Sequence, residues 1–328
     1  MESLILISKF LTKKFIGNRG VYFNMFKFIS TVLISLVAVN PLLSSSTKIN
    51  NSHFTNRKPV QTNSQYETNI VEYEPDSILD YLRNVFKNEA QTGVSTKEYN
   101  WYFKHVANGE PPEAPKETAH FVPKYDSYYI GDISKKTIYL TFDEGYENGY
   151  TAPILDVLKK HNVKAAFFVV KPYIKSNPDL IKRMVDEGHL VCNHSARHPS
   201  MASIIDQSKF NKELSEVEDA FQEVTGKKMP RYFRPPMGKY SEKSLLYTKS
   251  YGYKTIFWSF AYADWQPNKQ PSPEFAKKRI LDRTHNGAII LLHAVSKTNA
   301  DILDSVITEW KKQGYEIRSL DELPKNLS

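Results

Sequence analysis

The sequence predicts an α/β fold with a parallel sheet, and three observations carry that prediction. From about residue 124 onward, short β-branched and aromatic runs alternate with stretches of helical periodicity. Six such alternations follow one another within about 200 residues, the size of one large domain. Five of the expected strands end in side chains that can ligate, ionise or donate, as strands at the sites of parallel folds do. Periodicity alone does not choose between a barrel and an open sheet.

The expected strands are short and apolar, whereas the expected helices carry apolar residues at steps of three and four. We expect strands at 137–142, 165–170, 190–194, 232–234, 255–260, 288–293 and 316–320. We expect helices near 153–161, 178–187, 206–224, 241–251, 273–285 and 299–313. In the third helix, Leu214, Val217 and Phe221 share the face that should pack on the sheet.

Three segments are expected before the domain at 124–328. Residues 1–47 hold an apolar run at 28–43 behind a basic start, which is typical of a signal peptide, either cleaved or kept as a membrane anchor. Our hypothesis is that synthesis starts at Met25. Residues 48–69 are rich in polar residues and indicate a linker, and residues 70–123 indicate a small helical and aromatic arm packed on the domain. We therefore expect an exported protein, anchored to the membrane or associated with the cell wall.

The composition narrows the class of partner. A net charge of +8 and a pI near 9.1 suit an anionic surrounding such as nucleic acid, a membrane surface or an anionic cell wall. The Lys and Arg residues are scattered and form no dense basic block, which disfavours nucleic acid. The one cysteine, Cys192, excludes an internal disulfide and is expected to be a buried thiol. We expect a monomer.

Two adjacent acids, Asp143 and Glu144, follow the first expected strand directly. Carboxylates at the end of a buried strand are costly unless they are paired, protonated or bound to a metal. The position therefore favours a functional site, and the alternative is a polar turn that caps a helix.

His194 and His198 give the strongest indication of a metal. They are four residues apart, so they face the same way if the loop takes one helical turn. With one carboxylate they would make a site that leaves positions open for water and substrate. The alternative is two surface histidines on a loop. His189 and His285 fit no such set, and we expect them to be structural.

Asp143 and three more residues at strand ends suit acid–base chemistry. A bound divalent metal would lower the pKa of water from about 15.7 toward about 7, and Asp143 would take its proton if Arg234 keeps it ionised. His293 suits the general acid that protonates a departing amine, if Asp264 keeps it charged. The set predicts metal-assisted hydrolysis of an amide or ester. Taken singly, Asp264 could cap a turn, Arg234 could make a structural ion pair and His293 could be a core histidine.

These residues resemble the five motifs of the polysaccharide deacetylases, the NodB-homology domain of carbohydrate esterase family four. The motifs run in family order as Thr141-Phe-Asp-Glu-Gly-Tyr146, His194-Ser-Ala-Arg-His-Pro199, Arg234-Pro-Pro236, Asp264-Trp265 and Leu291-Leu-His293, and the resemblance covers about 130–325. It implies a distorted (β/α)7-type barrel that removes N- or O-acetyl groups from a glycan with the help of a divalent metal, with zinc as the expected ion.

The resemblance also implies a role for each matched residue. Asp143 would be the base and Arg234 its partner, and His293 would be the acid, tuned by Asp264. His194, His198 and the residue at Glu144 would be the metal ligands. Pro235 and Trp265 would line the substrate groove, and the backbone N–H near Met237 would help to hold the oxyanion.

A closer resemblance is to the muramic-acid deacetylases of spore-forming bacteria, also called delta-lactam-biosynthetic de-N-acetylases. It rests on Trp101-Tyr-Phe-Lys104 with Pro111-Pro112, on Leu140–Thr151, on Phe257-Trp-Ser259 and on Leu291–Ala300. It implies that N-acetylmuramic acid in peptide-stripped peptidoglycan loses its acetyl group and closes to the muramic δ-lactam of spore cortex. A general deacetylase acting on N-acetylglucosamine or O-acetyl groups, and an inactive glycan-binding module, are the alternatives.

Glu144 is where the chain departs from the family pattern. The family has Asp there as the third metal ligand, and the muramic branch often has Asn. Glu is one methylene longer, about 1.5 Å, whereas metal–ligand distances tolerate about ±0.2 Å. Glu144 would therefore ligate directly, through water, or not at all, which would leave a two-histidine site.

Overall fold

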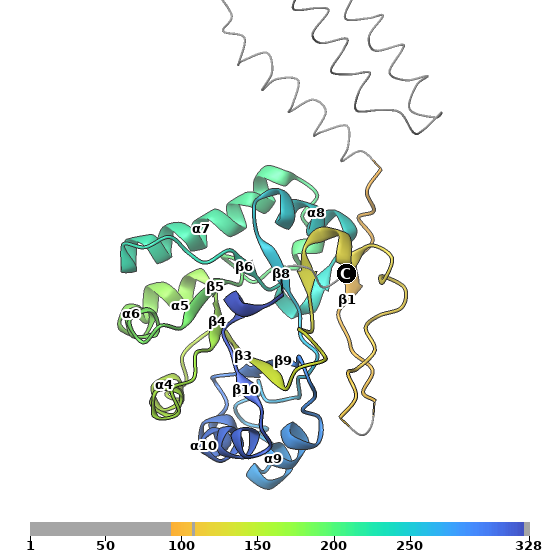
Figure 1. Ribbon diagram of the computed structural model, residues 1–328. Helices are drawn as coiled ribbons and strands as arrows, with labels where there is room; N and C mark the ends of the chain where they lie inside the picture. The colour runs from red at the N-terminus through yellow and green to blue at the C-terminus, as the bar shows by residue number, and fades with distance from the viewer. Residues whose placement is uncertain (1–92, 107–108, 325–328) are drawn as a thin grey trace, which may run out of the picture. The chain divides into compact units, whose positions relative to one another are not determined.

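The computed structural model describes residues 93–106 and 109–324 (Figure 1). The expected signal or anchor segment, the linker and the first part of the arm lie outside these residues, so those predictions stay predictions. Within the described ranges, none of the helices has the length and apolar character needed to cross a bilayer.

A parallel sheet forms the centre of the fold. All seven expected strands are present, and most of them are shorter than expected. An eighth strand, β2, joins them, and the order in the sheet is β10–β3–β4–β5–β6–β8–β2, with β9 also paired to β3. Their bounds are β2 Ser127–Tyr128, β3 Thr137–Glu144, β4 Ala166–Val169, β5 Leu190–Asn193, β6 Tyr232–Phe233, β8 Lys254–Ile256, β9 Ile289–His293 and β10 Glu316–Ile317. β2 was not expected, because a strand of two residues is too short to show an alternation of apolar and polar side chains.

The sheet curls until its two sides meet. Beyond β8, the Ser259 N–H donates to Ile289 O (3.0 Å) and the Leu291 N–H donates to Phe260 O (2.9 Å), so that Phe260 pairs in parallel with Ile290. The expectation of a barrel-like α/β fold is therefore confirmed as a curled parallel sheet. The strand ends that carry polar residues are drawn to one edge of this sheet.

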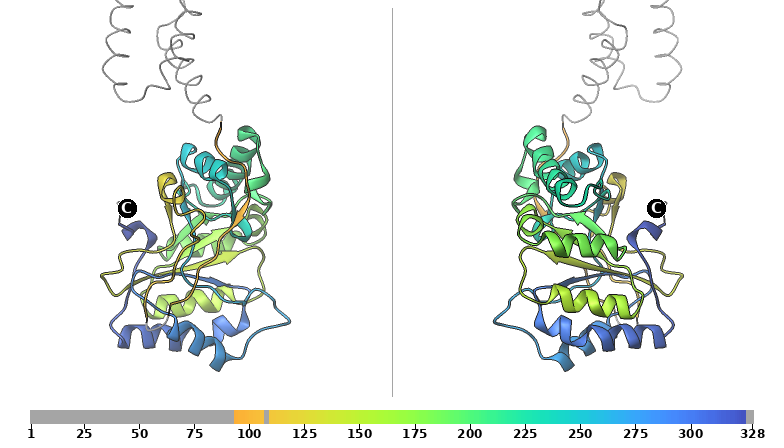
Figure 2. Two further views of the ribbon diagram at one scale, coloured as in Figure 1. Left: turned by 90° about the vertical axis from the view of Figure 1, so that its right-hand side faces the viewer. Right: turned by 90° about the vertical axis from the view of Figure 1, so that its left-hand side faces the viewer.

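Helices cover the outer face of the sheet (Figures 1 and 2). They are α4 Thr151–Lys160, α5 Lys171–Ser176, α6 Pro178–Asp186, α7 Gln207–Thr225, α8 Glu242–Ser250, α9 Pro273–Asp282 and α10 Lys297–Lys312. α7 begins where Asp206 accepts from the Lys209 N–H and ends where Gly226 takes φ 69°, a conformation open to glycine. The sequence analysis missed α5, a short helix whose Pro172 favours the first turn.

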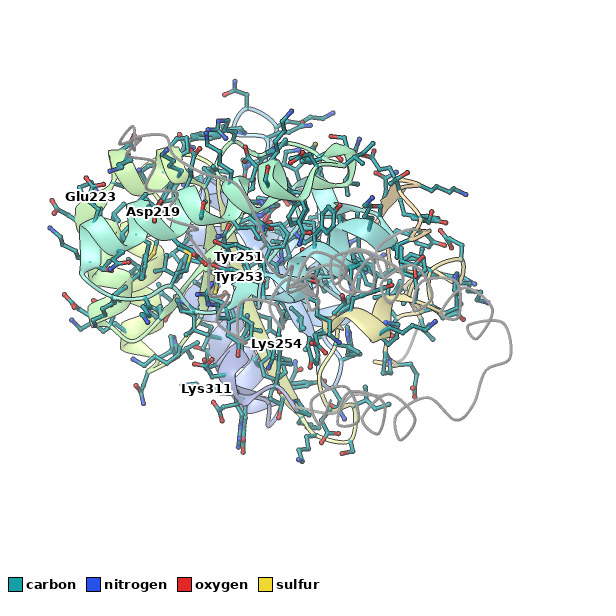
Figure 3. The ribbon with its side chains drawn as sticks, turned by 90° about the horizontal axis from the view of Figure 1, so that it is seen from above. Asp219, Glu223, Tyr251, Tyr253, Lys254 and Lys311 are labelled. Atoms are coloured by element: carbon teal, nitrogen blue, oxygen red, sulfur yellow. The ribbon has the colours of Figure 1, made fainter. Side chains whose placement is uncertain are left out.

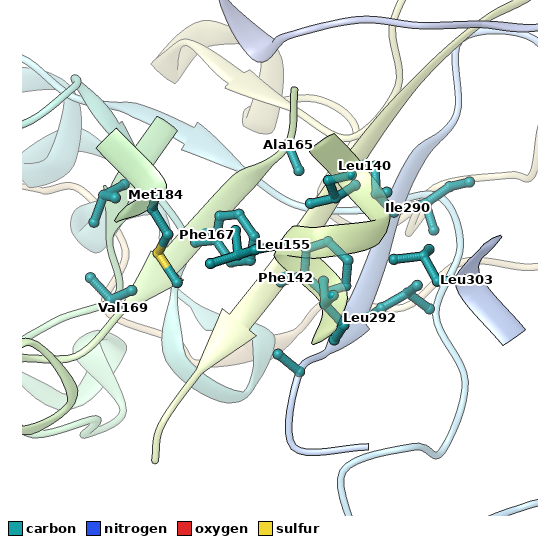
Figure 4. Close-up of a cluster of buried hydrophobic side chains, with 14 of the residues drawn as sticks. Leu140, Phe142, Leu155, Ala165, Phe167, Val169, Met184, Ile290, Leu292 and Leu303 are labelled. Carbon is teal, nitrogen blue, oxygen red and sulfur yellow. The ribbon is translucent and has the colours of Figure 1, made fainter. Parts of the chain in front are cut away.

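Strand alternation divides the apolar residues between the two faces of the sheet. On the helix side, Leu140 and Phe142 of β3 pack with Phe167 and Leu155, and the Phe142 and Phe167 rings stack at 5.1 Å (Figure 4). A separate cluster fills the inner face, to which β3 contributes Tyr139. Odd-numbered residues of β3 thus point inward and even-numbered residues point to the helices.

The edge at which the strands begin is filled by aromatic and charged side chains. Tyr251 and Tyr253 stack at 5.9 Å, and Lys254 opens β8 beside them (Figure 3). Lys311 lies in the last turn of α10, shortly before β10. The predicted site residues lie at the opposite edge, where the strands end.

Candidate active site

β3 ends in two carboxylates that face opposite sides of the sheet. Asp143 continues the inward series of Tyr139 and Thr141, and it lies in register with His293 on the neighbouring strand β9. Glu144 continues the helix-side series of Leu140 and Phe142. The two acids that the sequence analysis treated as one candidate pair therefore belong to different environments.

Asp143 is paired with a fully buried arginine. Arg234 Nη1 donates to Asp143 Oδ1 at 2.8 Å, and the guanidinium also donates to Ile256 O (3.0 Å) and Phe257 O (3.3 Å). The guanidinium carbon lies 4.2 Å from the centre of the Phe168 ring. Burial opposes ionisation of Asp143, but the charge of Arg234 outweighs it and holds the pKa of Asp143 below its usual value.

His194 and His198 come together at the end of β5, with ring centres 4.9 Å apart. The loop between them is not a helical turn, because Ser195 (φ 68°) and His198 (φ 58°) both take left-handed conformations. The Ser195 Oγ accepts from the His198 N–H at 3.0 Å and holds this bend. The expected meeting of the two rings occurs, but through a bent loop.

The two histidines have the chemistry of metal ligands. His194 Nδ1 lies 2.8 Å from the carbonyl oxygen of Arg234. The other ring nitrogen, Nε2, faces Asp143 and lies 3.6 Å from its Oδ2. Burial lowers the pKa of His194 to about 4, against the opposing charge of Asp143, and burial also lowers the pKa of His198. Both rings are therefore neutral at neutral pH, as binding of a divalent ion requires.

Glu144 does not join them. Its carboxylate is buried with no hydrogen-bond partner for either oxygen, and burial, followed by the charges of Glu147 and Asp143, raises its pKa well above the usual value. Within residues 93–106 and 109–324, no three His, Cys, Asp or Glu side chains are arranged as a metal site. The donor set thus fits a divalent ion at its two histidines, whereas the expected third ligand points to the helix layer because of strand alternation.

His293 is held by a buried carboxylate on the other side of the site. Its Nδ1 lies 2.7 Å from Asp264 Oδ1, and its backbone N–H donates to Asp264 Oδ2 at 2.8 Å. Burial alone would lower the pKa of His293, but the charge of Asp264 outweighs it and raises the pKa above its usual value. Asp264 is fully buried and His293 is partly exposed, so the imidazole is open to a ligand from the solvent side.

The three residues expected to contact the substrate differ in exposure. Met237 and Trp265 are about half exposed, at 53% and 50%, and the Trp265 ring centre lies 5.9 Å from that of His293. Pro235 is buried and precedes a short 3-10 turn, η4 Pro236–Gly238, in which Met237 takes φ 58°. Met237 thus combines a left-handed backbone conformation with an exposed side chain.

Sequence reasoning gave no role to two polar residues, Asn299 and Tyr262, next to Asp264 and His293. Asn299 Nδ2 donates to Asp264 Oδ2 at 2.6 Å and to His293 O at 3.1 Å, and Asn299 Oδ1 accepts from the Tyr262 hydroxyl. Asn299 is buried in the first turn of α10. The sequence offered one indication, an Asn among the apolar residues of a predicted helix. Its partner, Asp264, could not be identified without knowing which way the helix faces.

His189, His285 and Cys192 are all buried. His189 Nδ1 accepts from the Ala165 N–H at 3.2 Å, and His285 Nε2 lies 2.9 Å from Ser259 Oγ. Cys192 is a buried free thiol on the inner face of the sheet.

Comparisons with known proteins agree on one family. A family model described as polysaccharide deacetylase matches residues 131–256. An uncharacterized protein of Geobacillus stearothermophilus is 52% identical over 230 residues, which cover 70% of this chain and 86% of that protein. The peptidoglycan-N-acetylmuramic acid deacetylase PdaA of Bacillus subtilis is 48% identical over 230 residues, which cover 70% of this chain and 87% of that protein. The solved structure of Bacillus subtilis PdaA, a family 4 carbohydrate esterase, matches with a TM-score of 0.68 at 47% identity and covers 70% of this chain and 98% of that chain.

Proposed function

We propose, from the premise that this chain belongs to the polysaccharide deacetylase family, that it hydrolyses the N-acetyl group of N-acetylmuramic acid in peptidoglycan. The chain is a hydrolase of that family, and the finer choice of sugar rests on its similarity to a muramic-acid deacetylase. The observation that carries the proposal is the pairing of Asp143 and His293 in register on adjacent strands, each with its own buried partner.

Asp143 acts as the general base in this proposal. Its carboxylate is kept ionised by Arg234, and its second oxygen, Oδ2, is free of the guanidinium and faces His194. That oxygen takes a proton from the water that attacks the acetyl carbonyl. A base of this kind contributes about 10²–10⁴ in rate.

His293 acts as the general acid. The Asp264 carboxylate binds Nδ1, so Nε2 carries the proton that is passed to the departing amine. Asn299 and the His293 backbone saturate the second oxygen of Asp264, which fixes the orientation of the carboxylate. The exposed Met237 and Trp265 border the groove, and the N–H near Met237 helps to hold the oxyanion.

Deacetylases of this family depend on a metal in general, and we propose that His194 and His198 hold a divalent ion, with zinc as our choice. When bound, such an ion polarises the acetyl carbonyl and makes water more acidic. The neutral rings of both histidines and their shared approach to Asp143 support this placement.

The freed amine lies next to the lactyl group of the same sugar. We propose that it then closes on the lactyl carboxyl group with loss of water, giving a muramic δ-lactam of the kind found in spore cortex. A glycan strand already stripped of peptide is the substrate that leaves this carboxyl group accessible. We also propose export to the cell wall, on the apolar run at 28–43.

Muropeptide analysis tests the proposed function. Peptidoglycan with and without its stem peptides is incubated with the protein and zinc, digested and analysed by mass spectrometry. We expect acetyl loss from muramic acid in the stripped sample, and no loss with the variant His293→Ala. Acetyl loss from glucosamine alone would contradict the choice of sugar, and no acetyl loss from either sugar would contradict this enzyme function.

A further inference from the structure

The part of the N-terminal arm that the structure describes is hydrogen-bonded to the active-site edge. β1 (Tyr99–Asn100) pairs antiparallel with β7 (Lys239–Tyr240), and the Trp101 N–H donates to Gly238 O at 2.7 Å. Gly238 closes the Arg234-Pro-Pro-Met segment that carries the guanidinium and the exposed Met237. The arm therefore meets the catalytic edge directly.

The Trp101 side chain is linked to Arg234 through two residues that contact both of them, Phe257 and Trp258. It is 6% exposed, its ring stacks on Phe257 at 4.2 Å with 14° between the planes, and its Nε1–H donates to Trp258 O at 2.8 Å. The same two residues contact Arg234 on their other side. Phe257 O accepts from Arg234 Nη2 at 3.3 Å, and the Trp258 ring centre lies 5.7 Å from the guanidinium carbon.

Gly238 shows how tightly these parts fit. A Cβ added there would lie 2.8 Å from the Trp258 ring and 3.2 Å from Trp101 Cβ, and the residue takes φ 65°. Both the space and the backbone conformation exclude a larger residue. Gly238 therefore lies in close contact with both Trp101 and the Trp258 ring.

Glu98 extends the same contact to the histidine loop. Its carboxylate binds Lys239 Nζ at 2.9 Å and accepts from the Ser200 hydroxyl, two residues after His198. One arm segment thus joins the loops that end β5 and β6. Partly exposed ion pairs contribute little energy, so Trp101 is the stronger of the two connections.

We propose that Trp101 is a positioning residue of the active site, which seats Arg234 against Asp143 through Phe257 and Trp258. The proposal rests on the proposed function, because it assigns the arm a part in the same reaction. A purely structural role would have Trp101 stabilise the arm without affecting the chemistry. The positioning role predicts that substitution of Trp101 lowers kcat while the fold stays intact. The purely structural role predicts that kcat is unchanged while the fold stays intact.

The test uses two matched tryptophans in the full chain. Trp101→Phe keeps a ring for stacking but removes the Nε1–H bond to Trp258 O. Trp310→Phe is the control, because Trp310 on α10 is likewise buried, at 0% exposure, and donates its Nε1–H to Thr284 Oγ1 at 2.8 Å. We expect Trp101→Phe to lower kcat by roughly tenfold with KM unchanged, and Trp101→Ala by about 100-fold, the loss caused by misplacing a group by about 1 Å. The control should keep the wild-type kcat.

A second measurement does not depend on activity. Hydrogen exchange of the peptide covering 235–240 should accelerate in Trp101→Phe and stay unchanged in Trp310→Phe. Equal kcat in the two variants, or unchanged exchange at 235–240, would overturn the positioning role. Loss of all activity in the wild type would instead count against the proposed function, and the exchange result would still decide whether Trp101 braces this turn.

Discussion

The two faces of β3 treat a carboxylate in opposite ways. Asp143 on the inner face has a buried arginine as partner and a pKa held below its usual value, whereas Glu144 on the helix face has no hydrogen bond and a pKa raised well above it. Both side chains are buried, with 8% of Asp143 and none of Glu144 exposed, so burial does not distinguish them. The difference shows that the partner, and not the position at the strand end, decides whether a buried acid can act as a base.

The largest effect should come from removing the charge of Asp143. Asp143→Asn keeps the shape but takes away the proton acceptor, so we expect kcat to fall by about 10³–10⁴, at the upper part of the range for a general base. It also leaves the Arg234 charge buried without its partner, and loss of one partner of a buried pair costs about 3–5 kcal/mol of unfolding free energy. Turnover and urea denaturation check the two effects.

Glu144→Gln is the matched control for that experiment. It makes the same chemical change one residue away, on the other face of β3. We expect kcat to stay within about threefold of wild type, since no step is assigned to Glu144. A loss in Glu144→Gln as large as that in Asp143→Asn would remove the distinction between the two faces.

The next effect concerns metal binding. His194→Ala removes one of the two neutral imidazoles, so we expect the protein to lose its divalent ion during dialysis. Glu144→Gln should keep it with unchanged affinity, because the carboxylate faces the helix layer. Metal content after equilibrium dialysis, measured by mass spectrometry, is the readout. Weaker binding in Glu144→Gln would restore Glu144 as a ligand, and full occupancy in His194→Ala would exclude His194.

These contrasts also mark what could be predicted from the sequence. Strand periodicity and the motifs were sufficient for the parallel sheet, for the meeting of His194 with His198, and for the pairing of Asp143 with Arg234 and of His293 with Asp264. The opposite orientations of Asp143 and Glu144 required the strand to continue through both residues, and the expected strand stopped at 142. Asn299 and Trp101 could not be assigned, because their roles depend on the register of α10 and on pairing between segments more than 100 residues apart.

A smaller effect should appear in the pH dependence of the acid. The charge of Asp264 raises the pKa of His293, so Asp264→Asn lets burial lower that pKa. Because the acid must be protonated, we expect the basic limb of kcat/KM to move to lower pH. Asp304→Asn is the control, since Asp304 pairs with His161 on the surface at 2.6 Å. A basic limb that does not move in Asp264→Asn would remove His293 from the role of acid.

The smallest effect, in stability, tests the helix face alone. Because the folded-state pKa of Glu144 is raised, its ionisation costs no stability below the unfolded pKa, and the fold loses stability as the pH rises toward the folded pKa. Glu144→Leu removes a buried group without partners, so at pH 8 we expect it to stabilise the fold by about 1–3 kcal/mol, with a smaller gain at pH 4. Glu147→Leu is the control, because Glu147 accepts from the Gly149 N–H at 2.6 Å and from Tyr173, and its loss should destabilise. Urea denaturation at both pH values measures this, and destabilisation by Glu144→Leu that grows with pH would mean that the Glu144 carboxylate has a stabilising partner when ionised.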